Sequence, residues 1–320
     1  MKIKRYTVDN QKEWDDFIKK SENGTFLHLR DYMDYHQDRF QDYSLMIYDD
    51  EKPVALFPAH KNNRQIFSHN GLTYGDFIFP KNFRTEYKLQ VINESFKYLK
   101  NNWVDKVHIK TVPEIFKQYP NQINTYLYEI IGGKIEKILP FFVLDNQSFH
   151  PNSDRKKNIK KAQKLDFTVQ QNPELIDEFW KIVDENLQTK YQSRPVHSLD
   201  EIKLLMKRFP NEIELITAIK DNKIISGALC FKINHTFHFQ YIHSVNDKEL
   251  RGGVDSLVFR IIRYYLEKYQ FISLGSAEKS NGLLNKNLTY WKESFGAYAV
   301  NQYFYTFDLS ITDLNPKILI

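Results

Sequence analysis

The feature that most constrains this chain is an order of secondary-structure elements that its hydrophobic pattern predicts twice. We read each half as strand, two helices, three strands, long helix, strand, helix and strand. The second half shows the order most clearly, with elements predicted at residues 167–170, 173–190, 199–209, 213–219, 224–233, 236–244, 253–269, 271–274, 283–295 and 298–309. No identity between the halves is visible, so the repeat rests on element order alone. A chance match in both halves is less plausible than in one, which favours two tandem domains.

Helical stripes and short turns support this order in the second half. Its long helix has apolar residues at helical spacing: Val254, Leu257, Val258, Ile261, Ile262, Tyr265 and Leu266. Short polar links at Asp221–Asn222 and Asn234–His235 join three strands into a predicted meander. Ser198 is suited to cap the helix that follows it.

The first half predicts the same kinds of element. They are expected at residues 3–8, around 14–18, 32–40, 44–48, 54–60, 64–67, 84–100, 106–110, 126–130 and 134–144. At 126–130, where the common order has a helix, we predict a strand, joined to the next strand by a hairpin turn at Gly132–Gly133.

Composition agrees with two globular domains. The chain has 320 residues, of which 42% are hydrophobic and 27% charged, and a typical domain holds roughly 100–200 residues. Cys230 is the only cysteine, which excludes an intrachain disulfide and a cysteine-rich zinc site. Its apolar neighbours predict a small buried residue. The net charge of +5 fits an anionic ligand or an RNA, but a solvated surface explains it equally well.

Targeting and membrane segments are not predicted. Residues 1–6 lack the apolar region of a signal peptide, and no uncharged apolar stretch approaches the roughly 20 residues that a membrane span needs. We therefore expect a cytoplasmic protein without a membrane span. The histidines lack the close spacing of metal ligands, so no metal is predicted. The oligomeric state does not follow from the sequence.

A basic segment lies between the two halves. Six of the ten residues from Arg155 to Lys164 are Lys or Arg, and Ile159 and Ala162 give the segment a thin apolar stripe. We predict a basic helix that links the domains. Its lysines are most simply a solvated face, and the alternative is a surface that faces phosphate or RNA.

The order of elements resembles that of the GNAT acetyltransferase fold, with its bent mixed sheet. Three stretches also resemble the Fem-type aminoacyl and peptidyl transferases, which carry two such domains. They are RKKNIKKAQKLDF at 155–167, the glycine turn at 70–76, and Leu274–Ser276 followed by Trp291–Gly296. The resemblance implies an α/β (α+β) chain of two tandem GNAT-like domains, residues 1–150 and 151–320, each a mixed bent sheet flanked by helices. No glycine-rich loop precedes the long helix of the first domain, so we expect that domain to be a scaffold and one wall of the acceptor cleft.

The chain departs from the resembled families at two places. Many Fem-type enzymes insert a long helical arm between the first two helices of the second domain, whereas only residues 188–197 join them here. The GNAT pyrophosphate loop reads Arg/Gln-x-x-Gly-x-Gly/Ala, and Lys248–Val254 has its glycines at a different spacing. Both an acyl-CoA, such as acetyl-CoA, and an aminoacyl-tRNA therefore stay open as donors.

The start of the long second-half helix is a candidate phosphate site. Gly252 and Gly253 would let a phosphate approach backbone N–H groups at the helix N-terminus, where the helix dipole favours anions. Arg251 would add a charged hydrogen bond. The alternative is a turn that only caps the helix.

The strand before that helix lines the donor carbonyl in the resembled fold, which makes Gln240 and Tyr241 candidates for donor binding. Strand alternation places Gln240 with His238 on one face and Tyr241 with His243 on the other. His243 could act as a general base near neutral pH. A single strand histidine is, however, more often a structural hydrogen-bonding residue.

Two residues of the last helix are also candidates for catalysis. Lys292 could bind a phosphate or stabilise a developing oxyanion, and its alternative is a solvated helix lysine. Tyr290 could protonate a leaving group, as a tyrosine on this helix does in some acetyltransferases. The two positions are roughly 200° apart around a helix, so at most one of them points into a site.

Polar residues of two loops are candidates to bind the acceptor. The loop at 188–197 roofs the acceptor site in the resembled fold, and its alternative role is an ordinary surface connection. The loop at 69–76 in the first domain could reach the same cleft from the other side. The candidate acceptor residues are Tyr191, Arg194, His197, His69, Tyr74 and Asp76.

The sequence leaves three functions open. The first is an acyltransferase that uses an acyl-CoA on the amine or hydroxyl of a small acceptor, such as an amino sugar. The second is a Fem-type enzyme that moves an amino acid from aminoacyl-tRNA to a peptidoglycan precursor. The third is a non-catalytic nucleotide- or RNA-binding module, which predicts that no turnover exists. The glycine pair modestly favours CoA, and the basic linker favours tRNA.

Overall fold

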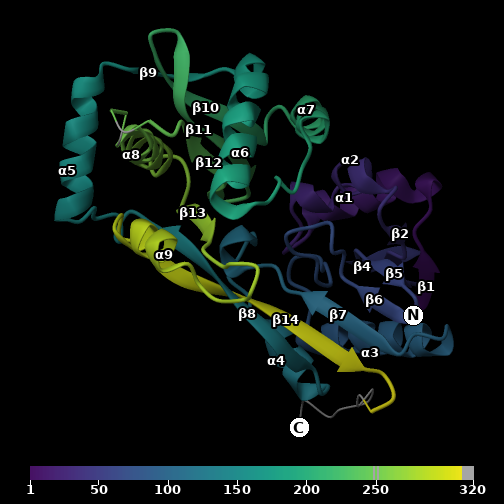
Figure 1. Ribbon diagram of the computed structural model, residues 1–320. Helices are drawn as coiled ribbons and strands as arrows, with labels where there is room; N and C mark the ends of the chain where they lie inside the picture. The colour runs from purple at the N-terminus through teal and green to yellow at the C-terminus, as the bar shows by residue number, and fades with distance from the viewer. Residues whose placement is uncertain (248, 251, 312–320) are drawn as a thin grey trace. The chain divides into compact units, whose positions relative to one another are not determined.

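The computed structural model describes residues 1–247, 249–250 and 252–311. By its contacts the chain divides into two compact units. Unit 1 holds Met1–Leu139 together with the chain from Asn301 on, and unit 2 holds Pro140–Val300. Figure 1 shows the elements of each unit. None of the described helices is both long enough and apolar enough to cross a membrane.

The chain passes between the units within two long strands, β8 (Lys134–Leu144) and β14 (Tyr298–Asp308). The predicted division at residue 150 places the whole of β14 in the second domain. In the structure, Phe304–Asp308 pair instead with β7 (Lys106–Lys110) of unit 1. This pairing joins residues far apart in sequence, so no local pattern could indicate it.

Unit 1 has two sheets and four α-helices among its described residues. The helices and 3-10 turns are η1 (Val8–Asn10), α1 (Gln11–Lys20), η2 (Phe26–His28), α2 (Arg30–Met33), η3 (Asp34–His36), α3 (Thr85–Asn101), η4 (Glu114–Phe116) and α4 (Ile123–Ile130). The further strands are β1 (Lys2–Arg5), β2 (Gln41–Asp42), β3 (Leu45–Asp49), β4 (Lys52–Phe57), β5 (His60–Asn62) and β6 (Gln65–Phe67). One sheet has the order β1-β3-β4, and the other runs β2-β5-β6-β7-β14, with β6 and β7 parallel. The apolar stripe of α3 is buried in the core of this unit, as its spacing predicts.

The strand predicted at 126–130 is wrong, because this segment is the helix α4. Its buried residues Asn124, Leu127 and Tyr128, followed by Ile131, have helical spacing. Gly132 and Gly133 end the helix instead of forming a hairpin. Their N–H groups donate to Glu129 O and Tyr128 O at 3.0 and 2.8 Å, the two bonds of a Schellman motif.

Gly132→Ala is expected to lower the free energy of unfolding by about 1 kcal/mol, because a left-handed backbone is strained for an L-residue. Gly132 has a φ of 86°, and a Cβ there would meet no atom within 4 Å, so the conformation alone is tested. Gly132→Asn is the matched control, since asparagine tolerates this conformation better. Urea unfolding of the parent and both variants checks that the free energy of unfolding falls in the order Gly132, Asn variant, Ala variant. Equal stability of the alanine variant and the parent would contradict this account.

Unit 2 has one six-stranded sheet with helices on both faces. Its helices and 3-10 turns are α5 (Ser153–Ala162), η5 (Gln163–Leu165), η6 (Pro173–Leu175), α6 (Ile176–Tyr191), α7 (Leu199–Arg208), α8 (Gly253–Tyr265) and α9 (Lys286–Glu293). The further strands are β9 (Thr168–Gln171), β10 (Ile213–Lys220), β11 (Lys223–Ile233), β12 (Thr236–Ser244) and β13 (Phe271–Ser276). The strand order is β8-β13-β12-β11-β10-β9. Figure 1 shows α6 and α8 on the two sides of β10, β11 and β12.

Several local predictions for unit 2 are confirmed. The strands β10, β11 and β12 form the predicted antiparallel meander. Ser198 caps α7 in a capping box with Glu201. The basic segment is the helix α5, whose Arg155, Ile159 and Ala162 are buried and whose remaining basic side chains are exposed.

Candidate active site

The candidate site lies in unit 2, where two neighbouring parallel strands diverge. β12 and β13 pair only through Thr236–His238 and Phe271–Ser273. β12 continues to Ser244 and stays paired with β11 along its other edge. Beyond His238, the edge of β12 that faces β13 has no strand partner among the described residues. Its backbone N–H and C=O groups can therefore bind a ligand.

A β-bulge interrupts β12 at the start of this open edge. Cys230 of β11 pairs with Phe239, whereas the preceding Leu229 pairs with Tyr241. Gln240 is therefore the extra residue of the bulge. Bulges occur next to active sites because they redirect side chains and end regular pairing.

The bulge corrects the predicted faces of β12. Regular alternation would place His238 on the face opposite Tyr241 and His243. The extra residue instead places all three on one face of the strand. Trp180 of α6 packs edge-on against Tyr241, with ring centroids 5.0 Å apart, so this face is covered by α6.

A pocket of 380 Å³ lies where β12 and β13 diverge. It is lined by Asn186, Phe239, Gln240, Tyr241, Ile242, His243, Ser244, Val254, Leu274, Ser276, Leu288, Trp291 and Lys292. Four residues predicted from the sequence are thus brought together: Gln240, Tyr241, His243 and Lys292. The lining combines apolar and aromatic side chains with a few polar groups, as ligand pockets do.

Lys292 is the buried cation of this pocket. Its residue is 3% exposed, and its Nζ donates to the carbonyl oxygens of Gly275 and Ser276 at 2.9 and 2.5 Å. Burial lowers the pKa of Lys292 to about 7, because the protein interior disfavours the ammonium form. Such a lysine can exchange a proton near neutral pH or bind a negative charge.

Tyr290 lies outside the pocket lining. It is half exposed, and its hydroxyl donates to Asp154 Oδ2 at 3.0 Å. The helical spacing thus separates it from Lys292, as expected. Protonation of a leaving group by Tyr290 stays a prediction.

His238 forms a hydrogen bond with the side chain of Gln240. Its Nδ1 lies 3.0 Å from Ser273 Oγ, which accepts a hydrogen bond from Gly275 N–H at 3.3 Å. Burial, with a smaller effect of Lys292, lowers the pKa of His238 to about 4. At least one amide N–H of Gln240 is therefore left for a ligand.

The hydroxyl of Tyr241 is positioned by the connection between α6 and α7. His197 is buried there, and its Nδ1 lies 2.8 Å from Tyr241 Oη. Arg194 of the same connection is exposed. Tyr191 ends α6, and its side chain lies outside the described part of the structure. Of these three acceptor candidates, His197 reaches the pocket lining, through Tyr241.

The predicted glycine pair opens α8 beside the pocket. Gly252 has a φ of 93°, and a Cβ there would lie 2.9 Å from Asn158 O of α5, so both conformation and space require glycine. Gly253 is the first residue of α8, and Val254 lines the pocket. Arg251 lies outside the described residues, so its phosphate contact stays a prediction.

A buried ion pair joins the first turn of α8 to α5 and α9. Arg155 pairs with Asp255, which also accepts a hydrogen bond from Trp291 Nε1 at 2.8 Å. Arg155 Nε donates to Ser294 Oγ at 2.9 Å. From the sequence, Arg155 was predicted only as part of the basic segment. The one signal for its role is that it is the single arginine in a run of lysines, and arginine suits buried ion pairs.

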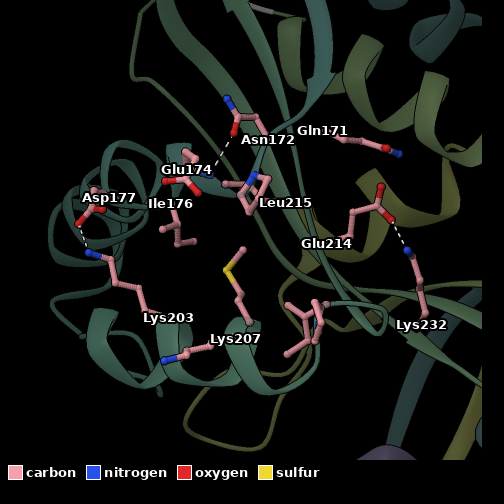
Figure 2. Close-up of a pocket in the computed structure, with 14 residues that line it drawn as sticks. Gln171, Asn172, Glu174, Ile176, Asp177, Lys203, Lys207, Glu214, Leu215 and Lys232 are labelled. Atoms are coloured by element: carbon pink, nitrogen blue, oxygen red, sulfur yellow. Dashed lines mark hydrogen bonds and ion pairs between the residues drawn. The ribbon is translucent and has the colours of Figure 1, made fainter.

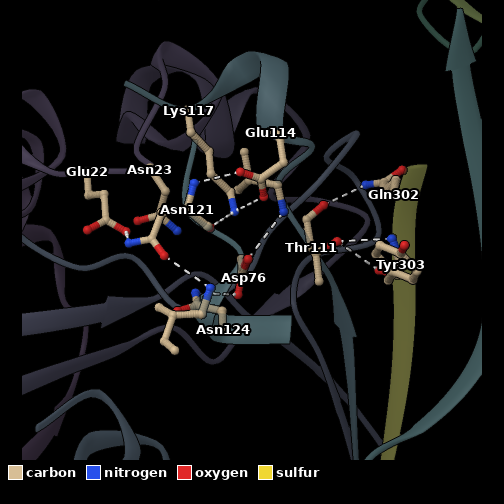
Figure 3. Close-up of polar contacts among 12 residues, drawn as sticks. Glu22, Asn23, Asp76, Thr111, Glu114, Lys117, Asn121, Asn124, Gln302 and Tyr303 are labelled. Atoms are coloured by element: carbon tan, nitrogen blue, oxygen red, sulfur yellow. Dashed lines mark hydrogen bonds and ion pairs between the residues drawn. The ribbon is translucent and has the colours of Figure 1, made fainter. Parts of the chain in front are cut away.

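The acceptor candidates of the first domain form the interior of unit 1. Tyr74 and Asp76 are fully buried, and Tyr74 donates to Thr25 Oγ1 at 3.1 Å. Asp76 accepts hydrogen bonds from Tyr128 and from Val112 N–H. Figure 3 shows this polar cluster around Asp76. These contacts are those of structural residues, and we do not assign either residue to the pocket of unit 2.

His69 is also buried, in a cluster of histidines within unit 1. Its ring stacks on His36 with centroids 5.1 Å apart, and His60 lies edge-on at 5.5 Å. Burial lowers the pKa of His60 to about 4. No group of three or more His, Cys, Asp or Glu in the described chain is placed to hold a metal ion.

A second pocket of 580 Å³ lies between α6, α7 and β10 in unit 2. Figure 2 shows the ion pairs on its wall: Lys203 with Asp177 at 2.6 Å and Lys232 with Glu214 at 2.8 Å. None of the predicted site residues whose side chains the structure describes lines it. The smaller pocket is the better candidate, because the open strand edge, the glycine start of α8 and Lys292 meet there.

Comparisons with solved structures show the fold of the chain. The structure is similar to that of FemX, with a TM-score of 0.66 and 12% identity over 96% of this chain and 97% of that one. It is similar to the C-terminal domain of a putative lysylphosphatidylglycerol synthetase from Agrobacterium fabrum, with a TM-score of 0.59 and 12% identity over 93% and 91%. A tandem GNAT protein from the clavulanic acid biosynthesis pathway matches with a TM-score of 0.52 and 9% identity over 98% and 99%.

These likenesses confirm the predicted fold, which is the mixed α/β architecture of FemX and of tandem GNAT proteins. At such low identity they show the fold alone. No protein-family model and no curated protein matches the sequence. The activity must therefore be argued from the site.

Proposed function

We propose that this protein transfers an acyl group from an acyl-CoA to the amine or hydroxyl of a small acceptor, and amino sugars are the acceptors to test first. The observation that carries the proposal is the open edge of β12, which borders a pocket beside the glycine start of α8. The amide groups of the CoA arm can bind such an edge as an added strand would. The N-terminus of α8 then suits the phosphates.

The residues of the pocket match the needs of acyl transfer. A backbone N–H of the open β12 edge polarises the acyl carbonyl and stabilises the oxyanion that forms on it. His243 takes the proton from the attacking amine or hydroxyl. The new bond to the acyl carbon forms, the carbon–sulfur bond breaks, and His243 passes the proton it took from the nucleophile to the departing sulfur, so that CoA leaves as the thiol. Tyr241, held by His197, fixes the wall on which the acceptor rests.

Saturating acetyl-CoA or CoA is expected to raise the melting temperature of the protein by a few degrees. A ligand at 100 times its Kd adds about 2.7 kcal/mol to the free energy of unfolding if it binds only the folded state. Thermal unfolding with and without each ligand measures this shift, and a positive result justifies an acceptor screen.

Val254→Trp should abolish the shift, because Val254 lines the pocket and a larger ring would fill it. Val196→Trp is the matched control, since Val196 is 79% exposed and outside the pocket lining. If the parent protein shows no shift with either ligand at millimolar concentration, CoA is not the donor.

A second candidate, transfer from an aminoacyl-tRNA, is favoured by one observation. The exposed face of α5 carries Lys156, Lys157, Lys160 and Lys161. Such a row of cations suits a phosphate backbone, and binding to it would weaken steeply with salt. Binding of tRNA that depends on these lysines, without binding of CoA, would favour this reading.

A further inference from the structure

The polar groups at the Lys292 end of the pocket are hydrogen-bond donors. Ser276 Oγ accepts from the N–H of Glu278 at 3.2 Å, which leaves its hydroxyl hydrogen for a ligand. Gln240 forms one hydrogen bond with His238 and keeps at least one amide N–H for the pocket. Lys292 donates to two carbonyl oxygens, and an ammonium has a third N–H to give.

These donors belong to one connected piece of structure. Lys292 binds the carbonyl oxygens of Gly275 and Ser276. A Cβ on Gly275 would lie 3.5 Å from His238 Cε1, so the imidazole that bonds to Gln240 lies close to the same turn. Gly275 itself has a φ of 70° and lies two residues beyond Ser273, the last residue of β13 that pairs with β12. The strand divergence therefore gathers Lys292, Gln240 and Ser276 at one end of the pocket.

The described lining of this pocket can carry a positive charge but no carboxylate. Among its described residues Lys292 is the only Lys or Arg, and none is Asp or Glu. A buried ammonium is costly unless an anion compensates it. The neutral carbonyl partners of Lys292 supply hydrogen bonds but no charge. A ligand carboxylate would supply the missing negative charge, whereas the α-ammonium of an aminoacyl group would meet a like charge.

We infer, building on the proposed function, that the acyl group carried in this pocket is itself anionic: the half-acyl group of a dicarboxylic acid, with its free carboxylate bound by Lys292, Gln240 and Ser276. The acyl carbonyl still lies on the open edge of β12. Lys292 then acts in substrate recognition and selects donors by the charge of their acyl group.

The test compares direct binding of CoA, acetyl-CoA and succinyl-CoA by isothermal titration calorimetry, in the absence of an acceptor. Succinyl-CoA is expected to bind at least about tenfold more tightly than acetyl-CoA, as a charge-assisted contact to a desolvated group allows. Lys292→Met should remove this preference, so that the variant binds succinyl-CoA and acetyl-CoA with affinities within about twofold of each other, because the charge that distinguishes them is lost. Lys286→Met is the matched control, because Lys286 lies exposed on the same helix.

The outcomes separate this inference from the proposed function. If acetyl-CoA and succinyl-CoA bind the parent protein equally well, the proposed CoA site is supported and the inference of an anionic acyl group is wrong. If Lys292→Met keeps the preference for succinyl-CoA, Lys292 is not the recognising group. If none of the three CoA compounds binds, the proposed function fails, and this inference fails with it. The comparison on the parent protein needs no variant, so a poorly folded Lys292→Met cannot hide the result.

Discussion

Acidification from pH 7 to pH 5 is expected to lower the free energy of unfolding by about 2 kcal/mol for each of two buried histidines, His28 and His238. Burial lowers the pKa of both to about 4, against an ordinary value of 6.5. The folded protein therefore binds fewer protons than the unfolded chain between these values. The contribution of each neutral histidine to the free energy of unfolding is complete above pH 6.5 and is lost as the pH falls towards 4.

The geometry of His28 explains why the folded state requires the neutral ring. His28 is fully buried in unit 1, and its Nδ1 accepts a hydrogen bond from Thr25 N–H at 3.1 Å. Its Nε2 lies 3.1 Å from Gly75 O and donates to it. A second proton, on Nδ1, would face the N–H of Thr25 and break this bond. The cost of protonation is therefore both electrostatic and geometric.

Urea unfolding at pH 7, 6 and 5 measures the effect. His28→Gln and His238→Gln should each flatten the dependence of stability on pH, whatever their stability at pH 7. His235→Gln is the control, because His235 is exposed. Burial raises the pKa of Asp76, which acts in the opposite direction, so the comparison between variants isolates the histidines. If the dependence of stability on pH were unchanged in both glutamine variants, these two histidines would not be its cause.

The elements of unit 2 could be predicted because their signals are local. The apolar stripe of α8 and the short turns of the β10–β12 meander depend on neighbouring residues only. The segment of α4 shows the limit of such signals. Its residues are compatible with a strand, and the burial of Asn124, Leu127 and Tyr128 on one side decides for a helix.

The candidate site could be predicted in part. The resemblance led to Lys292 and to the strand that carries Gln240, Tyr241 and His243, and these four residues share the lining of one pocket. The bulge at Gln240 was not predictable, because a bulge is defined by pairing between two strands. Side-chain contacts that form only in the folded protein were not predictable either, and the hydrogen bond between His238 and Gln240 is an example.

Arg155→Met is expected to lower the free energy of unfolding by about 3–5 kcal/mol, since it leaves the buried carboxylate of Asp255 without its cation. The two side chains are each 7% exposed. Asp255 would keep hydrogen bonds from Trp291 and Asn158 but no positive charge. Lys156→Met is the control, because Lys156 is the next residue of α5 and is exposed. Urea unfolding of both variants measures the difference.

The double variant Arg155→Met with Asp255→Leu tests the cause. If the cost of Arg155→Met is an uncompensated charge, removing both charges should recover most of the lost stability. If instead it is lost packing of the arginine against the rings of Trp291 and Phe295, the double variant will be no more stable than the single one. Trp291 lines the pocket and Asp255 follows Val254, so the ion pair also fixes two walls of the candidate site. A double variant that regains stability but binds the donor weakly would show that Arg155 and Asp255 position the pocket as well as stabilise the fold.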